Sequence, residues 1–180
     1  VRRRGAIMGQ VTGGGMSAVV GLDPDRITAV LEGTDAGRRV DVANFNSFEQ
    51  TVIAGPLDDL AAVKPDLTAA GARVIPLKVS APFHSRYMRE AQAEFAAALA
   101  DAEFGAFQIP VIANVTARPY EAAGADETLA RQIGQSVRWL DTVCYLLDQG
   151  VETFEEVGPG SVLTKLVGQI RKRRDTPPAP

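Results

Sequence analysis

His84 is the only histidine in the 180-residue chain and is the side chain best suited to acid–base chemistry. It follows Pro82-Phe83 in a stretch typical of a loop and precedes an expected helix, so it does not belong to an apolar periodic face. Loops held on a rigid scaffold often carry reactive groups, and imidazole changes its protonation near neutral pH. With no second histidine and one distant cysteine, Cys144, a metal site is not expected. The sequence therefore indicates a general base, with a purely structural histidine as the alternative.

A general base needs a hydroxyl or thiol to activate, and the chain offers no convincing nucleophile. No serine lies in a Gly-x-Ser-x-Gly turn between a strand and a helix. Ser17, in the stretch GMSAV, comes nearest, but the second glycine is missing and the residue starts an expected strand. Cys144 lies on an apolar helical stretch, where a buried thiol is inert. We expect the nucleophile to be supplied by polypeptide outside this sequence.

Other residues are candidates for binding or orienting a substrate. Arg4 ends a basic opening stretch that is ordinarily a solvated surface, but a guanidinium also forms bidentate pairs with small carboxylates. The amides Gln132 and Asn114 are suited to orienting an imidazole, although nothing local singles them out. The run 158–160 (GPG) before a helix suggests phosphate binding. Because it lacks the lysine and glycine spacing of a P-loop, a plain strand-to-helix turn is favoured.

Two groups of elements are expected to position these residues. In residues 13–77, after a flexible glycine-rich entry, the pattern predicts strand, helix, strand, strand, helix and strand, which is the ferredoxin-like order. Asp23 caps the first of these helices. The second is expected to run to about Ala70 with Leu57 on its buried face, and Pro65 should kink or split it.

Residues 78–174 show strands alternating with helices, which implies part of a parallel sheet. Only two strands, at 109–114 and 151–157, are expected there, so we predict that the remaining strands lie upstream of residue 1. Residues 1–12 are interpreted as the end of a helix of the same large subdomain. Residues 175–180 are rich in proline and are expected to be a disordered tail.

The composition excludes several other classes of protein. With 19 Lys plus Arg against 22 Asp plus Glu, the formal net charge is −3, which offers no electrostatic basis for nucleic-acid binding. No apolar run approaches the roughly 20 residues needed to cross a bilayer, and no signal peptide is recognisable. The lone Cys144 cannot form an internal disulfide. We therefore expect a cytoplasmic globular protein without nucleic-acid or membrane partners.

Three blocks of sequence resemble the malonyl-CoA:acyl carrier protein transacylases and occur in that family's order and nearly at its spacing. They are VANFNS with QTVIAG (42–55), LKVSAPFHSRYM (77–88) and FEEVGPGSVL (154–163). The resemblance implies an α/β fold, in which part of an α/β-hydrolase-like acyltransferase domain carries a ferredoxin-like (βαββαβ) subdomain. The implied reaction, in fatty acid biosynthesis, moves malonyl from malonyl-CoA to the phosphopantetheine thiol of acyl carrier protein through a malonyl-serine ester. No cofactor is implied, and the whole enzyme is expected to be monomeric.

The same resemblance assigns roles to individual residues. His84 corresponds to the base, the main-chain carbonyl of Gln132 holds its ring, and Arg4 clamps the malonyl carboxylate. Asn46 lies near the bound substrate, and Phe83 is typical of malonyl-selective members. The family's Gly-His-Ser-Leu-Gly elbow and its glutamine-containing oxyanion loop would precede this sequence, so the chain alone is expected to be inactive.

Two other interpretations remain open at this point. The first is the acyltransferase domain of a polyketide synthase, although the contexts of Asn46 and His84 look closer to the stand-alone enzymes. The second is a non-catalytic, ferredoxin-like ligand-binding module. In that case residues 78–180 would be an extension that docks a partner, and His84 would be incidental.

Overall fold

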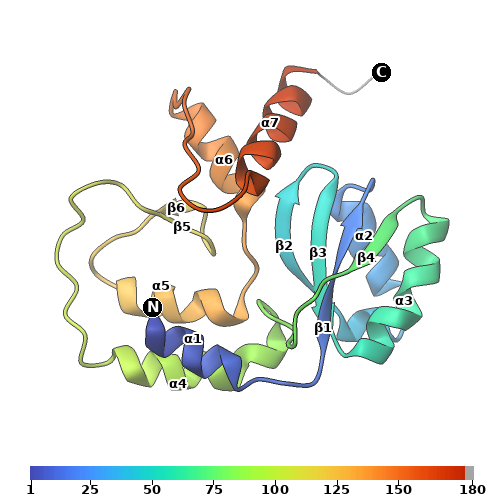
Figure 1. Ribbon diagram of the computed structural model, residues 1–180, viewed down its shortest axis with the longest axis horizontal. Helices are drawn as coiled ribbons and strands as arrows, with labels where there is room; N and C mark the ends of the chain where they lie inside the picture. The colour runs from blue at the N-terminus through green and yellow to red at the C-terminus, as the bar shows by residue number, and fades with distance from the viewer. Residues whose placement is uncertain (177–180) are drawn as a thin grey trace.

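A computed structural model describes residues 1–176 of the chain (Figure 1). Its main sheet is four-stranded, and two helices pack on one face. The elements of this part are β1 (Gly15–Val20), α2 (Pro24–Glu32), η1 (Gly37–Arg39), β2 (Asp41–Ser47), β3 (Gln50–Gly55), α3 (Leu57–Ala69) and β4 (Arg73–Pro76). The remaining elements are α1 (Arg2–Gly9), η2 (Arg86–Met88), α4 (Arg89–Leu99), β5 (Ile112–Ala113), β6 (Arg118–Pro119), α5 (Ala125–Gly134), α6 (Trp139–Asp148) and α7 (Val162–Asp175).

The order of elements predicted between residues 13 and 77 is confirmed. The strands lie in the order β2-β3-β1-β4, and every neighbouring pair is antiparallel. In the central strand, Ser17 is opposite Ile53 on one side and Pro76 on the other. The carboxylate of Asp23 accepts from the backbone N–H of Arg26 at 2.9 Å, which caps α2 as predicted.

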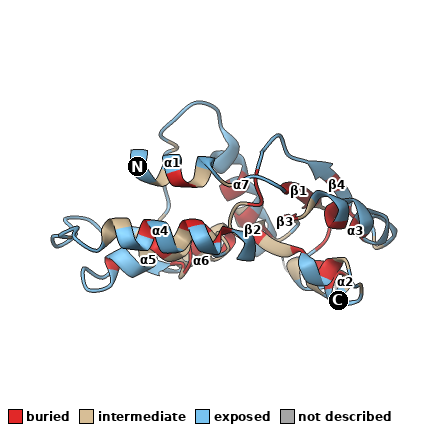
Figure 2. Cartoon of the chain, turned by 90° about the horizontal axis from the view of Figure 1, so that it is seen from below, coloured by how far each residue is buried: buried red, intermediate tan, exposed pale blue. Residues whose placement is uncertain are grey.

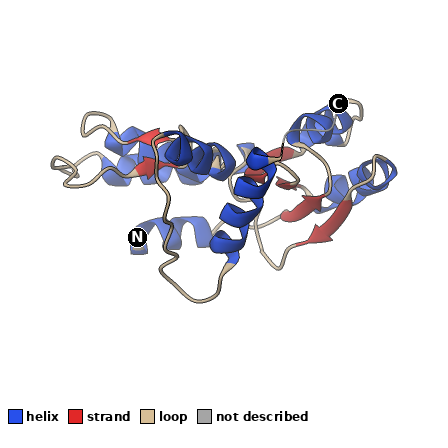
Figure 3. Cartoon of the chain, turned by 90° about the horizontal axis from the view of Figure 1, so that it is seen from above, coloured by secondary structure: helices blue, strands red, loops and turns tan. Residues whose placement is uncertain are grey.

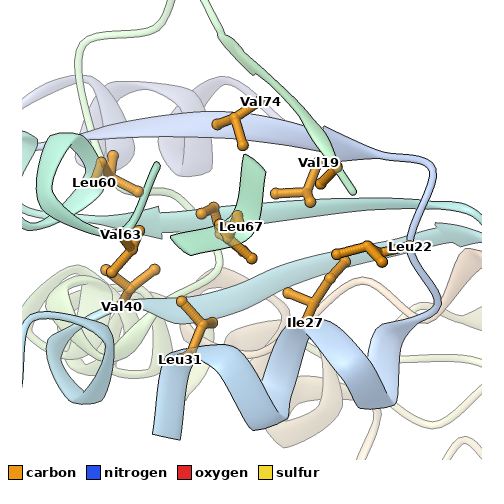
Figure 4. Packing of buried hydrophobic residues seen from close by; sticks show 11 residues of the cluster. Val19, Leu22, Ile27, Leu31, Val40, Leu60, Val63, Leu67 and Val74 are labelled. Carbon is orange, nitrogen blue, oxygen red and sulfur yellow. The ribbon is translucent and has the colours of Figure 1, made fainter. Parts of the chain in front are cut away.

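One face of the sheet holds the main core, between the strands and the two helices α2 and α3 (Figure 4). Val19 of β1, Ile27 of α2 and Leu67 of α3 are fully buried there. Because side chains alternate along a strand, Met16 and Ala18 belong instead to a second cluster on the other face of the sheet.

A helical group formed by α1, α4 and α5 lies beside the sheet (Figures 1 and 2). Ile7 of α1, Phe95 of α4 and Ile133 of α5 share its apolar interior. A third region, formed by α6 and α7, packs through Val143 and Ile170. None of the helices in residues 1–176 is long and apolar enough to span a membrane.

The connection between α5 and α6 ties these regions to the edge of the sheet. Val137 forms a parallel bridge with Asn44 of β2, and its N–H donates to the carbonyl of Ala43 at 2.8 Å. The hydroxyl of Ser136 donates to the carbonyl of Val42 at 2.6 Å. The end of α5 is therefore held close to β2.

The predicted strand at 151–157 is wrong, because this segment is a loop that leads into α7 (Figure 3). A strand needs a neighbour to accept and donate its backbone hydrogen bonds. Within residues 1–176 no strand pairs with this segment, and Val157 is 94% exposed. The predicted strand at 109–114 is reduced for the same reason to β5, which pairs only with β6.

Three smaller predictions also need correction. Leu57, the first residue of α3, is 64% exposed and not buried. Pro65 does not split α3, which continues through it to Ala69. Asp175 belongs to α7 and not to a disordered tail, whereas residues 177–180 of that predicted tail lie outside the described residues.

Candidate active site

The loop that carries His84 is held in a strained backbone conformation. His84 has a φ of 59°, in the left-handed region that residues with a side chain rarely adopt. Such strain persists only where the surroundings enforce it, and it is concentrated at functional sites. The flanking residues supply the constraint: Pro82 and Ser85 are buried, and the Ser85 hydroxyl donates to the Pro82 carbonyl.

The glycine-rich entry to β1, which the sequence indicated only as flexible, is part of the support for this loop. Gly14 has a φ of 148°, and a Cβ at this position would lie 2.9 Å from the carbonyl oxygen of Gly55 and 2.9 Å from the ring of Pro82. Only glycine permits this close approach. The start of β1 and the loop of His84 are therefore packed directly against each other.

Phe83, the residue before His84, also anchors this loop. Its half-buried ring packs against the sheet cluster that contains Met16 and Ala18, and also against the helical cluster that contains Ile7 and Met88. A single aromatic side chain thus joins the sheet to the helical group. His84, the next residue, is placed at that junction.

The imidazole of His84 is oriented by Gln132, 48 residues along the chain. Its Nδ1 lies 2.8 Å from the main-chain carbonyl oxygen of Gln132. This oxygen is free because the last four carbonyls of a helix have no partner within the helix, and Gln132 lies in the last turn of α5. In the neutral ring the proton is then on Nδ1, which leaves the lone pair on Nε2.

The surroundings favour the neutral imidazole. Burial lowers the pKa of His84 below its usual value of 6.5, the hydrogen bond to Gln132 opposes this shift, and the charge of Arg4 adds to it. A neutral ring with a free Nε2 lone pair is the form that accepts a proton. At neutral pH the ring of His84 is therefore mainly in the form that can accept a proton.

Arg4 is on the side of α1 that faces the site. It lies one turn before the buried Ile7 and is half-buried, whereas Arg2 and Arg3 are exposed. Its charge influences the pKa of His84, whose largest shift comes from burial. The family resemblance pointed to Arg4 among the three arginines, and the packing of α1 against α4 and α5 leaves this one half-buried.

The other predicted residues are only partly brought together. Asn46 is half-buried in an irregular part of β2, within the register shift between Phe45 and Ser47. No hydrogen bond within residues 1–176 joins its side chain to His84. The carbonyl of Asn114 accepts from the N–H of Arg138 at 2.9 Å, which is a structural role.

An open groove of about 810 Å³ lies beside His84. Its wall includes Phe45 and the ion pair between Arg86 and Asp41, in which Arg86 Nε is 2.8 Å from a carboxylate oxygen. Arg4 does not line this groove.

Sequence reasoning did not identify Tyr120 as part of the site. Its hydroxyl accepts a hydrogen bond from the side-chain amide of Gln132, the residue whose carbonyl holds His84. The charge of Arg4 also acts on the phenol of Tyr120, whose pKa is raised first by burial. No pattern in the sequence marks this contact, because the two residues are 12 positions apart and meet only in the folded chain.

The glycine run at 158–160 is a bend before α7, although the segment 151–157 that precedes it is a loop and not the expected strand. The carboxylate of Glu156 accepts from the backbone N–H groups of Leu163 at 3.2 Å and Thr164 at 2.9 Å. A side-chain anion thus occupies the start of α7, where a phosphate would otherwise bind. These bonds with Thr164 lower the pKa of Glu156 and favour its charged form.

The described residues combine an α/β fold with an imidazole held by a helix-end carbonyl. The sequence profile described as the acyl transferase domain matches residues 1–179, and the chain belongs to this family.

A polyketide biosynthesis malonyl CoA-acyl carrier protein transacylase of Bacillus velezensis is 45% identical over 185 residues, covering 99% of this chain and 62% of the relative. The crystal structure of a malonyl CoA-acyl carrier protein transacylase from Burkholderia pseudomallei superposes with a TM-score of 0.90 at 39% identity, over 99% of this chain and 62% of that one. A malonyl-transacylase in complex with its type II polyketide acyl carrier protein superposes with a TM-score of 0.88 at 37% identity, over 94% of this chain and 56% of that one.

Proposed function

We propose that this chain supplies the base and the carboxylate-binding arginine of an enzyme that transfers malonyl from malonyl-CoA to acyl carrier protein. The observation that carries the proposal is the bond between His84 Nδ1 and the Gln132 carbonyl, which favours the tautomer with its lone pair on Nε2. The similar transacylases named above support the choice of donor and acceptor. The chain spans about three-fifths of these relatives, at 62% and 56% of their lengths, and the activity of the whole protein is inferred from this part.

The proposed reaction has two halves that share one base. In the first half, His84 Nε2 removes the proton of a serine hydroxyl as the oxygen attacks the thioester carbonyl. The carbon–sulfur bond breaks, and coenzyme A leaves with the proton returned by the imidazolium. In the second half, His84 takes the proton of the phosphopantetheine thiol, and the thiolate displaces the serine oxygen, which recovers that proton.

The serine is not provided by an elbow motif within residues 1–180. We place it on polypeptide outside these residues, so the chain alone is proposed to form no acyl-enzyme. Arg4 is proposed to hold the malonyl carboxylate with its planar guanidinium. Phe83 is proposed to restrict the acyl group by its bulk, and Asn46 to lie near the bound substrate. These roles rest on the resemblance of the motifs.

Residues 13–77 are proposed to form a ferredoxin-like subdomain. The βαββαβ order of elements and the antiparallel strand order β2-β3-β1-β4 support this assignment. Residues 78–174, together with 1–12, are proposed to belong to the larger acyltransferase subdomain. The cytoplasmic location, the monomeric state and the absence of a cofactor remain predictions.

Transfer of labelled malonyl tests the proposal directly. The whole enzyme, incubated with radiolabelled malonyl-CoA and an acyl carrier protein bearing phosphopantetheine, should load label onto the carrier. The 180-residue chain alone should retain no covalent label. Carriers from fatty acid and from polyketide synthesis, assayed side by side, would distinguish the two pathways, since one similar transacylase serves polyketide biosynthesis. A stable adduct on the isolated chain would contradict the assignment of the nucleophile.

A further inference from the structure

We propose that Tyr120 is a positioning residue that orients the imidazole of His84 through Gln132. This inference rests on the proposed function of His84 as the base. Its geometric basis is a short relay, in which the Tyr120 hydroxyl binds the side-chain amide of Gln132 and the main-chain carbonyl of Gln132 binds Nδ1 of His84. Tyr120 itself does not touch the ring of the histidine in this relay.

The position of Tyr120 is well defined by its own surroundings. It follows β6 directly, and its backbone N–H donates to the carbonyl of Val111 at 2.8 Å. Its ring lies 5.6 Å from that of Phe107, centre to centre. The turn before β6 contains Ala117, fully buried with a φ of 53°, so this short hairpin is built on a strained residue.

The relay acts on the last turn of α5, which has fewer hydrogen bonds within the helix than the turns before it. Gln132 is in the last turn of α5, and helix ends fray because their final carbonyls lack helical partners. Fastening its side chain to Tyr120 restricts the last turn. The main-chain carbonyl is thereby kept at hydrogen-bonding distance from His84.

Charged groups around His84 influence its pKa, so they must stay unchanged if its titration is to test the relay. Arg4 of α1 lowers its pKa, after the larger effect of burial. The groove beside the ring is lined by Asp41, Arg86, Arg89 and Arg138. None of these side chains changes in the variants used below, so a change in the titration reports the relay.

The single histidine makes a clean test possible. The 180-residue chain, labelled with ¹⁵N-histidine, contains one imidazole, whose nitrogen shifts report both its pKa and the position of its proton. Tyr120→Phe removes the hydroxyl and keeps the ring. Because the bond to Gln132 raises the pKa of His84, we expect that pKa to fall and the share of neutral ring protonated on Nδ1 to decrease.

Three further variants complete the test. Gln132→Leu removes the same bond from the other partner and should produce the same change, and the double variant should add nothing, as for two members of one interaction. Tyr145→Phe is the matched control: this tyrosine is on α6, where the guanidinium of Arg118 covers its ring at 4.7 Å. It should leave the titration of His84 unchanged.

The outcomes separate this proposal from the proposed function. If His84 titrates identically in the original chain and in Tyr120→Phe, with the same tautomer, the relay is refuted even if the whole enzyme transfers malonyl. If the titration changes but the whole enzyme transfers no malonyl, the relay is supported and the function is not. Should Tyr120→Phe fail to fold by circular dichroism, Gln132→Leu decides by the same criteria.

Discussion

The ring nitrogen Nδ1 of His84 and the main-chain oxygen of Gln132 lie 2.8 Å apart, although they are separated by 48 residues of sequence. The bond joins a strained loop next to the sheet with the end of a helix in a different cluster. Its consequence is a defined tautomer, with the proton on Nδ1 and the basic lone pair on Nε2. The following predictions depend on this arrangement and on the elements that support it.

Replacing His84 by glutamine should abolish the function of the base while keeping a side chain of similar size. In the whole enzyme we expect malonyl transfer to fall roughly a hundred- to ten-thousandfold, because general base catalysis contributes about that factor. The rate of loading of acyl carrier protein from malonyl-CoA measures this. Tyr145→Phe serves as the control and should retain full activity. Transfer that persists in His84→Gln would support the non-catalytic interpretation.

The stability of the chain should depend on pH through His84. Its pKa is below 6.5 in the folded state, mainly through burial, with Arg4 contributing. Below that pH the unfolded chain binds a proton that the folded chain resists, so stability falls as the pH is lowered through 6.5. Denaturant unfolding between about pH 7.5 and 5.5 should show a steeper loss for the original chain than for His84→Gln. Equal slopes would indicate that the imidazole is not desolvated.

The same shift predicts the acid limb of the enzymatic pH profile. Because the base stays neutral below the ordinary histidine pKa of 6.5, kcat/KM for malonyl-CoA should begin to fall only at a more acid pH. Initial rates across a pH series measure this in the whole enzyme. If kcat/KM already falls at a pH above 6.5, the folded enzyme favours the charged imidazole instead.

Arg4→Lys should weaken recognition of a carboxylate while retaining the positive charge. A lysine cannot form the planar bidentate pair, and one charge-assisted hydrogen bond contributes about 1.5–3 kcal/mol. We expect kcat/KM for malonyl-CoA to fall roughly ten- to a hundredfold, with little change for acetyl-CoA, which has no carboxylate. Arg3→Lys, on the same helix but exposed, is the matched control. A similar loss in both variants would point to the general charge of α1.

Gly14→Ala should destabilise the fold and disturb the loop that carries His84. Its backbone has a φ of 148°, and the added Cβ would meet both Gly55 and Pro82 at 2.9 Å. Strain of this kind costs on the order of 1–3 kcal/mol. Gly13→Ala is the control, since its φ is also positive but its Cβ would meet nothing within 4 Å. If both variants unfold at the same denaturant concentration, the close packing against Pro82 is not important.

Leu67→Ala and Leu57→Ala test the core on a single helix. Leu67 is fully buried and Leu57 is 64% exposed, although both belong to α3. We expect the first change to lower the free energy of unfolding by about 2–5 kcal/mol, as cavities of this kind do. The second should change it by less than about 0.5 kcal/mol. Equilibrium denaturation of the two variants measures the difference, and similar values would contradict the orientation of α3.

The local pattern of the sequence was sufficient for the elements whose partners are close in the chain. The cap at Asp23 and the hairpin between β2 and β3 depend on contacts within a few residues. The prediction at 151–157 failed because an extended apolar run becomes a strand only beside another strand. In residues 1–176 none is available there, and a pattern in one segment carries no information about its neighbour.

By itself, the sequence determined that one imidazole stands in a loop before a helix and that no elbow serine accompanies it. It also determined the order of the elements in residues 13–77. Only the tertiary structure showed that Arg4 is half-buried whereas Arg2 and Arg3 are exposed, and that Tyr120 reaches Gln132. The physical reason is that side-chain orientation and hydrogen-bond partners depend on how helices and strands pack, and these contacts join residues that are far apart in the chain.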